Sequence, residues 1–377
     1  MTIERLLEGK RICICAGSGG VGKTTVSAAI ALGMAARGKR VAVVTIDPAK
    51  RLADSLGIDE LGNEARRVDP QRWRSSGATR CDGELWAMML DAKRTFDELV
   101  EKHAPDERSR DAVLSNRIYQ EISNAVAGSQ EYMAIEKLYE LHADGRYDLL
   151  VLDTPPVRNA LDFLDAPDRL ARFIDSRSLQ FLIGPSRHGL RLFGRGSGLL
   201  FSVLKRLTGV DLLQDLSEFF QSFAGMTEGF RTRAGRVNDL LRDPTTTFVL
   251  VTSPARDAVD EALTFRRRLR TTDLPFGGVI VNRTHGLDVV GEDASEAELG
   301  QLVGQALATK ALRSYRDHKA LAEHDRASVK RLAQELSDAG PSGSPILVPY
   351  LDEEIHNIGG LRRVNEHLFA DQTWPAD

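Results

Sequence analysis

The clearest chemical signature in the chain is the stretch CAGSGGVGKTT at residues 15–25. It contains the pattern G-x-x-x-x-G-K-T, which lies between a short apolar run and a segment with helical spacing. In that context glycines let backbone N–H groups converge on phosphate oxygens, and the following helix directs the positive end of its dipole at them. Lys23 would contact the β and γ phosphates of a nucleotide, and the hydroxyl of Thr24 would hold Mg²⁺. The predicted phosphate cradle consists of Gly17, Ser18, Gly19, Gly20, Val21, Gly22, Lys23, Thr24 and Thr25.

Hydrolysis of a bound nucleotide also needs a group that orients water and a carboxylate near the metal ion. Two acids occur at suitable places. Asp47 follows the apolar run RVAVVTI, and Asp153 ends the run YDLLVLD and precedes Thr-Pro-Pro. Ligands of parallel sheets bind beyond the carboxyl ends of the strands, so both acids would face the cradle. The alternative is that these aspartates only cap helices or turns.

The elements that must position these residues follow from the hydrophobic pattern. Short β-branched runs alternate with helical segments, and strands that are apolar throughout indicate a parallel sheet with helices on both faces. We therefore predict an α/β fold with a doubly wound, mostly parallel sheet. The predicted strands are RICICA (11–16), RVAVVTI (40–46), ELWAMML (84–90), YDLLVLD (147–153), TFVLVTS (247–253), GGVIVN (277–282) and PILVP (345–349).

The segment 161–242 departs from this alternation, since it contains no convincing strand and reads as several helices. We predict a core formed by residues 1–160 and 243–377, with 161–242 inserted as a helical lobe. Within the lobe, a basic run rich in Leu and Phe at 178–209 is interrupted by Gly. Helical spacing with glycine breaks suits a mobile amphipathic surface, and the alternative is that these side chains pack on the sheet and on each other. Residues 57–83 read as a surface excursion.

Composition narrows the class of protein. The 377 residues are 42% hydrophobic and 28% charged, as in ordinary globular proteins, and the net charge of -4 predicts no nucleic-acid partner. The charged stretch MTIERLLEGKR lacks the apolar region of a signal peptide, and no run approaches the length of a membrane span. We therefore predict a cytoplasmic protein without stable membrane insertion. Its cysteines, Cys13, Cys15 and Cys81, are predicted to be buried, reduced thiols.

With these segments in register, the sequence resembles the ArsA/Get3 family of P-loop ATPases, of the SIMIBI type, within the wider group that includes ParA, MinD and the nitrogenase iron protein. The matching stretches are GSGGVGKTT (17–25), DPAKRLADSLG (47–57), DTPP (153–156), VNR (281–283) and VPYLDEEIHNIGGL (348–361).

This resemblance implies a dimeric ATPase that uses ATP and Mg²⁺. Asp47 would orient or activate the attacking water, with Lys23 and Mg²⁺ neutralising charge, and Asp153 would hold Mg²⁺ through a water. Asn282 would read the adenine edge, and Pro349 with Tyr350 would line the base. For Asn282 the alternative is a strand-end amide that only satisfies backbone groups.

Three departures from the family pattern bear on function. The chain cannot build the cysteine cluster with which metalloid-binding members hold their substrate, and it lacks the C-x-x-C pair that clamps eukaryotic dimers through zinc. The family's usual loop carries a lysine at the position of Ser18, and that lysine reaches across the dimer to the partner's nucleotide. A serine is too short and uncharged to stabilise phosphate charge there. We hypothesise a heterodimer with a related subunit that retains the lysine; a basic residue such as Arg158 is the alternative source of charge.

The task coupled to ATP hydrolysis also follows from the resemblance. In Get3 a helical lobe in the corresponding place forms a groove for tail-anchor membrane helices, so we expect a hydrophobic or membrane-protein client. The lobe's sole methionine, Met226, disfavours this reading, because promiscuous hydrophobic surfaces often use several. One alternative is a positioning or regulatory ATPase similar to ParA or MinD, which the short acidic tail NEHLFADQTWPAD disfavours. The other is a metalloid-pump subunit, which the missing cysteine cluster disfavours.

Overall fold

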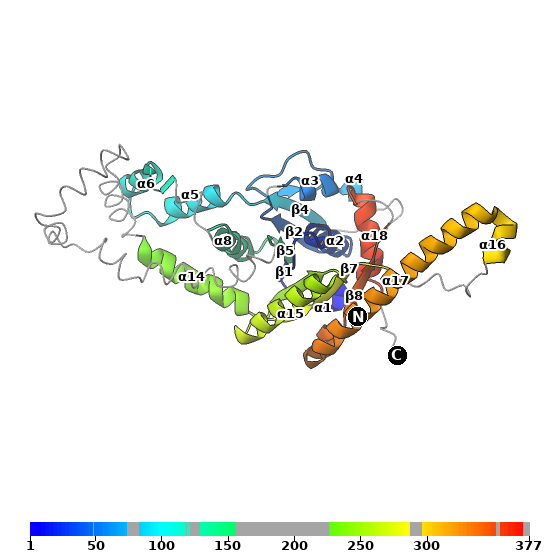
Figure 1. Ribbon diagram of the computed structural model, residues 1–377. Coiled ribbons are helices and arrows are strands. Elements are labelled where there is room, and N and C mark those ends of the chain that lie inside the picture. Colours follow the sequence, from blue (N-terminus) through cyan, green and yellow to red (C-terminus); the bar gives the residue numbers. More distant parts are fainter. Residues whose placement is uncertain are drawn as a thin grey trace, which may run out of the picture. The chain divides into compact units, whose positions relative to one another are not determined.

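Figure 1 presents a computed structural model of the chain, which describes residues 1–47, 49–73, 83–117, 119–120, 129–155, 226–286, 296–351 and 355–371. Packing divides the chain into two compact units. Unit 1 contains Met1–Met89, Leu141–Leu161 and Arg242–Asp377, and unit 2 contains Leu90–Glu140 and Asp162–Leu241. Unit 2 therefore contains Leu90–Glu140 in addition to most of the predicted lobe 161–242. Residues 161–225 of that lobe lie outside the described residues.

Unit 1 is built on one sheet, and each strand predicted from the sequence is present in it. The strands are β1 (Ile12–Ala16), β2 (Arg40–Thr45), β3 (Arg66–Arg67), β4 (Glu84–Met89), β5 (Leu149–Asp153), β6 (Thr246–Thr252), β7 (Phe276–Thr284) and β8 (Ile346–Pro349). Their order is β3-β4-β2-β5-β1-β6-β7-β8. Within the described residues the neighbouring strands pair in parallel, apart from the short edge strand β3, which is antiparallel to β4. The predicted doubly wound α/β fold is confirmed.

The order of the strands brings three carboxyl ends together. β1 lies between β5 and β6, and β5 lies between β1 and β2, although these strands are far apart in the sequence. In register, Cys15 of β1 and Thr45 of β2 both lie opposite Asp153 of β5. The loops that leave β1, β2 and β5 therefore start side by side, which is where open α/β sheets bind their ligands.

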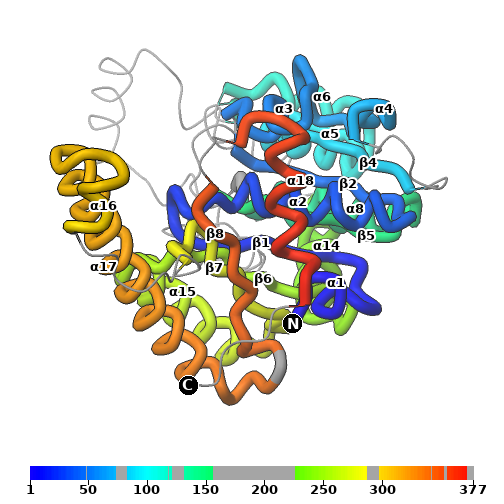
Figure 2. Tube along the Cα trace, turned by 90° about the vertical axis from the view of Figure 1, so that its right-hand side faces the viewer, coloured from blue at the N-terminus to red at the C-terminus, as the bar shows by residue number. Residues whose placement is uncertain are grey.

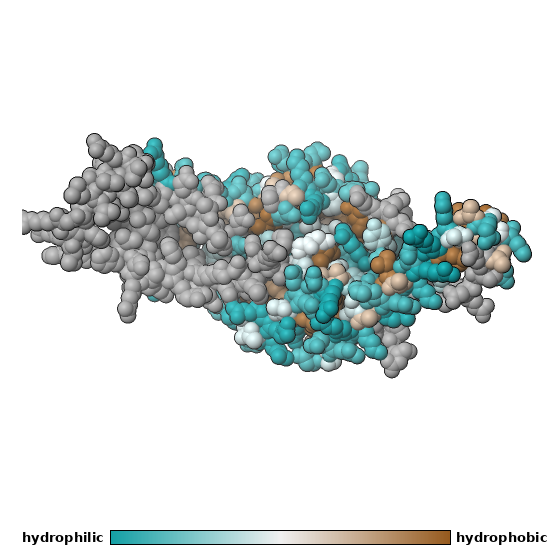
Figure 3. Space-filling model, in the orientation of Figure 1, coloured by the Kyte–Doolittle hydropathy of each residue, from teal (hydrophilic) through white to brown (hydrophobic). Residues whose placement is uncertain are grey.

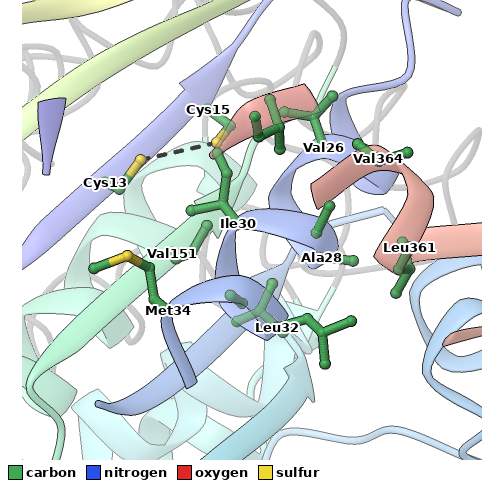
Figure 4. Packing of buried hydrophobic residues seen from close by; sticks show 14 of the residues in the cluster. Cys13, Cys15, Val26, Ala28, Ile30, Leu32, Met34, Val151, Leu361 and Val364 are labelled. Carbon is green, nitrogen blue, oxygen red and sulfur yellow. Dashed lines mark hydrogen bonds between the residues drawn. The ribbon is translucent and has the colours of Figure 1, made fainter. Parts of the chain in front are cut away.

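Helix α2 (Lys23–Ala35) is buried between the sheet and α18 (Ile358–Leu368), and Figure 2 shows the two helices lying against each other. Eleven residues of α2 are buried, so it is apolar on nearly all sides, as expected for a core helix. Figure 4 shows Cys13 and Cys15 of β1 with Val151 of β5 in one cluster with α2 and Leu361 and Val364 of α18. Both cysteines are buried free thiols, as predicted, and Cys81 lies outside the described residues.

The other helical elements among the described residues of unit 1 are α1 (Ile3–Leu6), α3 (Arg51–Leu56), α4 (Pro70–Trp73), α15 (Arg256–Thr271), α16 (Glu296–Val303), α17 (Gln305–Glu335) and the 3₁₀ segment η1 (Ser337–Gly343). Helix α15 packs on β6, β7 and α17 through a stripe of buried apolar residues. Figure 3 shows hydrophobic surface on α16 and α17. The exposed apolar side chains on these two helices are Leu302, Val303, Leu307 and Leu321. Among the described helices, none combines the length and apolar character needed to cross a bilayer.

The described part of the segment 57–83, residues 57–73 and 83, contributes more to the core than a surface excursion would. Its side chains of Leu61, Val68 and Trp73 are buried in the same hydrophobic cluster as α2. Spacing did not reveal this, because the three residues belong to no regular helix or strand of useful length.

The described part of unit 2 is helical and has its own core. It contains α5 (Ala92–His103), α6 (Glu107–Leu114) and most of α8 (Ser129–Asp144) and α14 (Thr227–Arg242). Phe96 of α5 packs against Tyr119 and Phe230, with ring centroids 5.5 and 5.9 Å apart. Met226, the methionine of the predicted lobe, is only 1% exposed and is therefore a core residue.

Candidate functional site

A cleft of about 590 Å³ opens beyond the carboxyl ends of the central strands. Its volume is within the range of roughly 300–1,000 Å³ that is usual for small-molecule sites. The lining residues come from the loops after β1, β2, β5 and β8, from the ends of strands β7 and β8, from the start of α2 and from α3. Most of the residues to which the sequence assigned chemistry are among them: Gly20, Gly22, Lys23, Thr24, Thr25, Asp47, Asn282, Pro349 and Tyr350.

The backbone of the predicted cradle requires glycine at specific points. Gly20 and Gly22 have φ values of 79° and 90°, which side chains rarely adopt. A Cβ at Gly17 would collide with the carbonyl oxygen of Val251 on β6, and one at Gly22 would collide with the amide of Asn282. Gly22 is also the N-cap of α2 and offers no side-chain cap. The first N–H groups of this helix therefore point into the loop and suit an anion.

Lys23 lies buried at the base of the cleft between the loop and two carboxylates. Its Nζ donates to the carbonyl oxygen of Ser18 at 2.8 Å. Burial lowers the pKa of the Lys23 ammonium, and the carboxylates of Asp153 and Asp47 act in the opposite direction. An ammonium has three donors, so Lys23 can keep its contact with the loop and still donate to phosphate oxygens.

Asp153 occupies the end of β5 and is almost fully buried. Its Oδ2 accepts hydrogen bonds from the hydroxyls of Thr24, at 2.7 Å, and Thr45, at 2.9 Å. Burial raises the pKa of Asp153 to about 6, although these two hydroxyls and Lys23 lower it. Its Oδ1 is buried without a hydrogen-bond partner among the described residues. A buried carboxylate oxygen left unpaired beside a threonine hydroxyl is a donor set that fits a hydrated Mg²⁺ ion.

Asp47 is held at the end of β2 by short local bonds. Its backbone N–H donates to the hydroxyl of Thr45 at 3.2 Å, and its Oδ1 accepts from the N–H of Ala49 at 2.9 Å. Thr45 therefore connects Asp47 to Asp153. The carboxylate also lies 3.9 Å from the guanidinium of Arg51, a residue of the cleft lining that is 71% exposed on its side chain. The sequence had assigned no role to Thr45 or Arg51.

Ser18 has a partner within the chain that the sequence did not indicate. Its hydroxyl donates to Oε2 of Glu261 on α15 at 2.5 Å, and its side chain is largely buried. A carboxylate on a helix carries no local sequence signal for such a contact, because the two residues are 243 positions apart. The side chain at the unusual position of the loop is thus fixed against the body of unit 1.

The cleft lining also includes the residues predicted to meet a base. Asn282 donates its Nδ2 to the carbonyl oxygen of Val21 at 2.8 Å, which ties β7 to the phosphate loop. Tyr350 is 59% exposed, and one face of its ring stacks on His285 with a centroid distance of 5.8 Å and an interplanar angle of 10°. His285 is fixed by Asp325 of α17, whose Oδ2 lies 2.8 Å from both the backbone N and the ring Nδ1 of His285.

The structure thus brings the predicted phosphate, metal and base residues of unit 1 to one cleft. Gly17, Ser18, Gly19 and Val21 belong to the loop itself, and Asp153 lies beneath it. Thr154 adds a tether that the sequence did not single out, because its hydroxyl donates to the carbonyl oxygen of Cys15 at 2.8 Å. Pro156 and Arg158 lie outside the described residues. The roles assigned to the individual residues stay predictions.

Comparisons with known proteins agree with the motifs. Residues 10–296 match the family of anion-transporting ATPases. The chain is 28% identical to ATPase GET3 of Malassezia globosa over 255 residues, 66% of each chain, and 28% identical to ATPase get3 of Aspergillus terreus over 270 residues, 71% of each. It is 27% identical to ATPase get3 of Schizosaccharomyces japonicus over 286 residues, which are 75% of this chain and 78% of that relative.

Proposed function

The chain belongs to the anion-transporting ATPase family, the ArsA/Get3 family, and is an ATP hydrolase; from that premise we propose that it couples Mg²⁺-dependent ATP hydrolysis to closure of a dimer. One observation carries the proposal. Lys23, Thr24, Asp47 and Asp153 line or underlie a single cleft beside the N-terminus of a buried helix. This is the set of groups that in-line transfer of a phosphoryl group to water requires.

In the proposed mechanism, the N–H groups of the phosphate loop and the Lys23 ammonium bind the phosphate chain and neutralise charge that develops on it. Asp47 orients the attacking water. The bond from the N–H of Ala49 holds its carboxylate, and the bond from its own backbone N–H to the Thr45 hydroxyl holds its main chain. Mg²⁺, held by the Thr24 hydroxyl and, through water, by Asp153, would supply further neutralisation at the β and γ phosphates. The Thr45 hydroxyl donates to the carboxylate of Asp153 and accepts from the backbone N–H of Asp47, so it links the two residues.

Adenine rather than guanine is the base that this cleft favours. Because Val21 offers a carbonyl oxygen, the Asn282 amide must direct Nδ2 toward it, which leaves Oδ1 as the group for a base edge. An acceptor matches the amino group of adenine and opposes the carbonyl oxygen of guanine. Tyr350, with Pro349 beside it, offers the exposed ring face on which the base would stack.

We further propose that the active form is a dimer in which another subunit supplies the charge missing at Ser18. Supporting this, Ser18 is bonded to Glu261 of its own chain and has no charge to offer a partner. Two measurements test the pairing. Mixing the purified chain with a related subunit that retains the loop lysine should raise phosphate release above the sum of the two alone, and Ser18→Lys should raise turnover of the chain alone. High turnover by the wild-type homodimer would contradict it.

The proposed client is a hydrophobic segment of a membrane-associated protein, handled in the cytoplasm by the lobe 161–242. The composition of 178–209 supports this proposal, although the buried Met226 is not available as part of such a surface. A photo-reactive group at Phe201 or Phe220 should crosslink a client in a nucleotide-dependent manner. A lobe that captures no client in any nucleotide state would refute it.

Equilibrium binding of ATP and GTP tests the nucleotide site itself. The wild type should bind ATP in the presence of Mg²⁺ and prefer it to GTP, and Lys23→Gln should lose most of the affinity for both. Asn282→Ala should narrow the preference for ATP over GTP. Equal affinity of the wild type and Lys23→Gln for ATP would contradict the assignment of the site.

A further inference from the structure

Arg283, at the end of β7, has an unusual backbone conformation. Its φ is 62°, in the left-handed region that residues other than glycine, asparagine and aspartate seldom occupy. It coincides with an irregularity in the pairing of β7 with β8, where the register shifts between Asn282 and Thr284. Strained backbone of this kind persists where the surroundings over-determine it, and such positions cluster at functional sites.

The residues on both sides of Arg283 are held by independent contacts. On one side, Asn282 donates to the carbonyl oxygen of Val21. On the other, the hydroxyl of Thr284 donates to the carbonyl oxygen of Val348 at 3.3 Å, and the carbonyl oxygen of Thr284 accepts from the N–H of Tyr350 at 2.9 Å. With both neighbours fixed in this way, the backbone of Arg283 is forced to turn, and its side chain is directed at the cleft.

That side chain reaches the phosphate loop. Nη1 of Arg283 donates to the carbonyl oxygen of Gly20 at 3.1 Å, and Arg283 belongs to the lining of the cleft. A guanidinium has five N–H donors in a rigid fork, of which this contact uses one. A planar, permanently charged fork is the side chain best suited to phosphate oxygens, and a glutamine or lysine does not reproduce it.

We propose that Arg283 is a phosphate-contacting residue of this nucleotide site. The proposal rests on the proposed function, since it requires that the cleft bind a nucleotide. Arg283 enters the cleft from β7, whereas Lys23 enters from the start of α2, so the phosphate chain is bound from two directions. The register shift between Asn282 and Thr284 turns the arginine toward the cleft, and the adjoining Asn282 is the residue proposed to contact the base.

Competition binding with ATP and adenosine tests this inference. Arg283→Gln, which keeps an amide donor but no charge, should lower the affinity for ATP about 10- to 100-fold, the range of charge-assisted hydrogen bonds. It should leave the affinity for adenosine within twofold of the wild type. Arg283→Lys should bind ATP with intermediate affinity. If Arg283→Gln binds ATP as tightly as the wild type, or loses adenosine to the same extent as ATP, the inference is overturned.

A matched pair of glycine substitutions separates phosphate contact from folding. Asp273, in the turn after α15, also has a positive φ, of 56°, and lies outside the cleft lining. Arg283→Gly and Asp273→Gly both remove a side chain from a left-handed position, so neither should lower the unfolding midpoint. Only Arg283→Gly should weaken ATP binding. Equal ATP affinities of these two variants would overturn the inference, whereas a wild type that binds no ATP would overturn the proposed function with it.

Discussion

Replacing Asp153 by asparagine should make the protein more stable in the absence of nucleotide and Mg²⁺. The Asp153 carboxyl is buried, and its pKa is raised to about 6, from the ordinary value of 3.8. The difference of about 2 units corresponds to roughly 3 kcal/mol that the folded state loses when this group ionises. Divided by the unfolding entropy expected for a chain of this size, this free energy corresponds to an increase of about 4 °C in the unfolding midpoint of Asp153→Asn at pH 7.5.

The sign of the pH dependence makes the test sharper. A carboxyl whose pKa is raised in the folded state contributes stability that is present below pH 3.8 and is lost as pH rises through 6. The stability of Asp153→Asn relative to the wild type should therefore increase between these two pH values. Thermal unfolding of both proteins at several pH values measures it. Asp148→Asn, at the amino end of β5, is the control of opposite sign, because the Arg40 hydrogen bonds lower the pKa of that carboxyl. If Asp153→Asn is less stable than the wild type at pH 7.5, the reasoning that the ionised Asp153 carboxylate destabilises the fold until a cation binds is refuted.

Three further substitutions test separate parts of the cleft. Lys23→Gln should lower turnover by at least about 100-fold, since it removes the buried charge from the phosphate loop, and phosphate release measures it. Gly22→Ala should abolish ATP binding, because the added Cβ would displace the Asn282 amide, and it should leave α2 folded. A binding titration measures the first effect, and circular dichroism checks that the helix is intact. Tyr350→Ala should weaken ATP binding by about 5- to 100-fold, as loss of a stacking partner does, whereas Tyr350→Phe should not; equal losses in both would show that the ring face is not the contact.

The sequence predicted best those residues whose type the backbone geometry requires and those that lie at the end of a strand. The strands could be predicted because parallel strands that are buried on both faces are mostly apolar, and every residue of β1, β5 and β6 is buried. The phosphate loop could be predicted because Gly17 and Gly22 have no room for a side chain. Asp47 and Asp153 followed from their positions after strands, which parallel topology brings to the same edge of the sheet.

Contacts between distant segments had no such signal. The partner of Ser18 is a glutamate on α15, and Tyr350 rests on His285, which in turn depends on Asp325 of α17. None of these pairs has a characteristic spacing, because the packing of helices on the sheet determines them. Arg283 belongs to the stretch VNR at 281–283, but only its positive φ and its contact with Gly20 distinguish it from an exposed surface arginine.

A single-turnover measurement tests the central claim most directly. The claim is that ATP is hydrolysed in this cleft and that Asp47 orients the attacking water. Purified protein in excess over radiolabelled ATP and Mg²⁺, with its dimer partner added where the chain alone is slow, would be followed for release of the γ-phosphate. We predict release by the wild type and at least a 100-fold slower rate for Asp47→Asn, with ATP affinity unchanged. Release by Asp47→Asn at the wild-type rate, or no release by the wild type with its partner present, would contradict it.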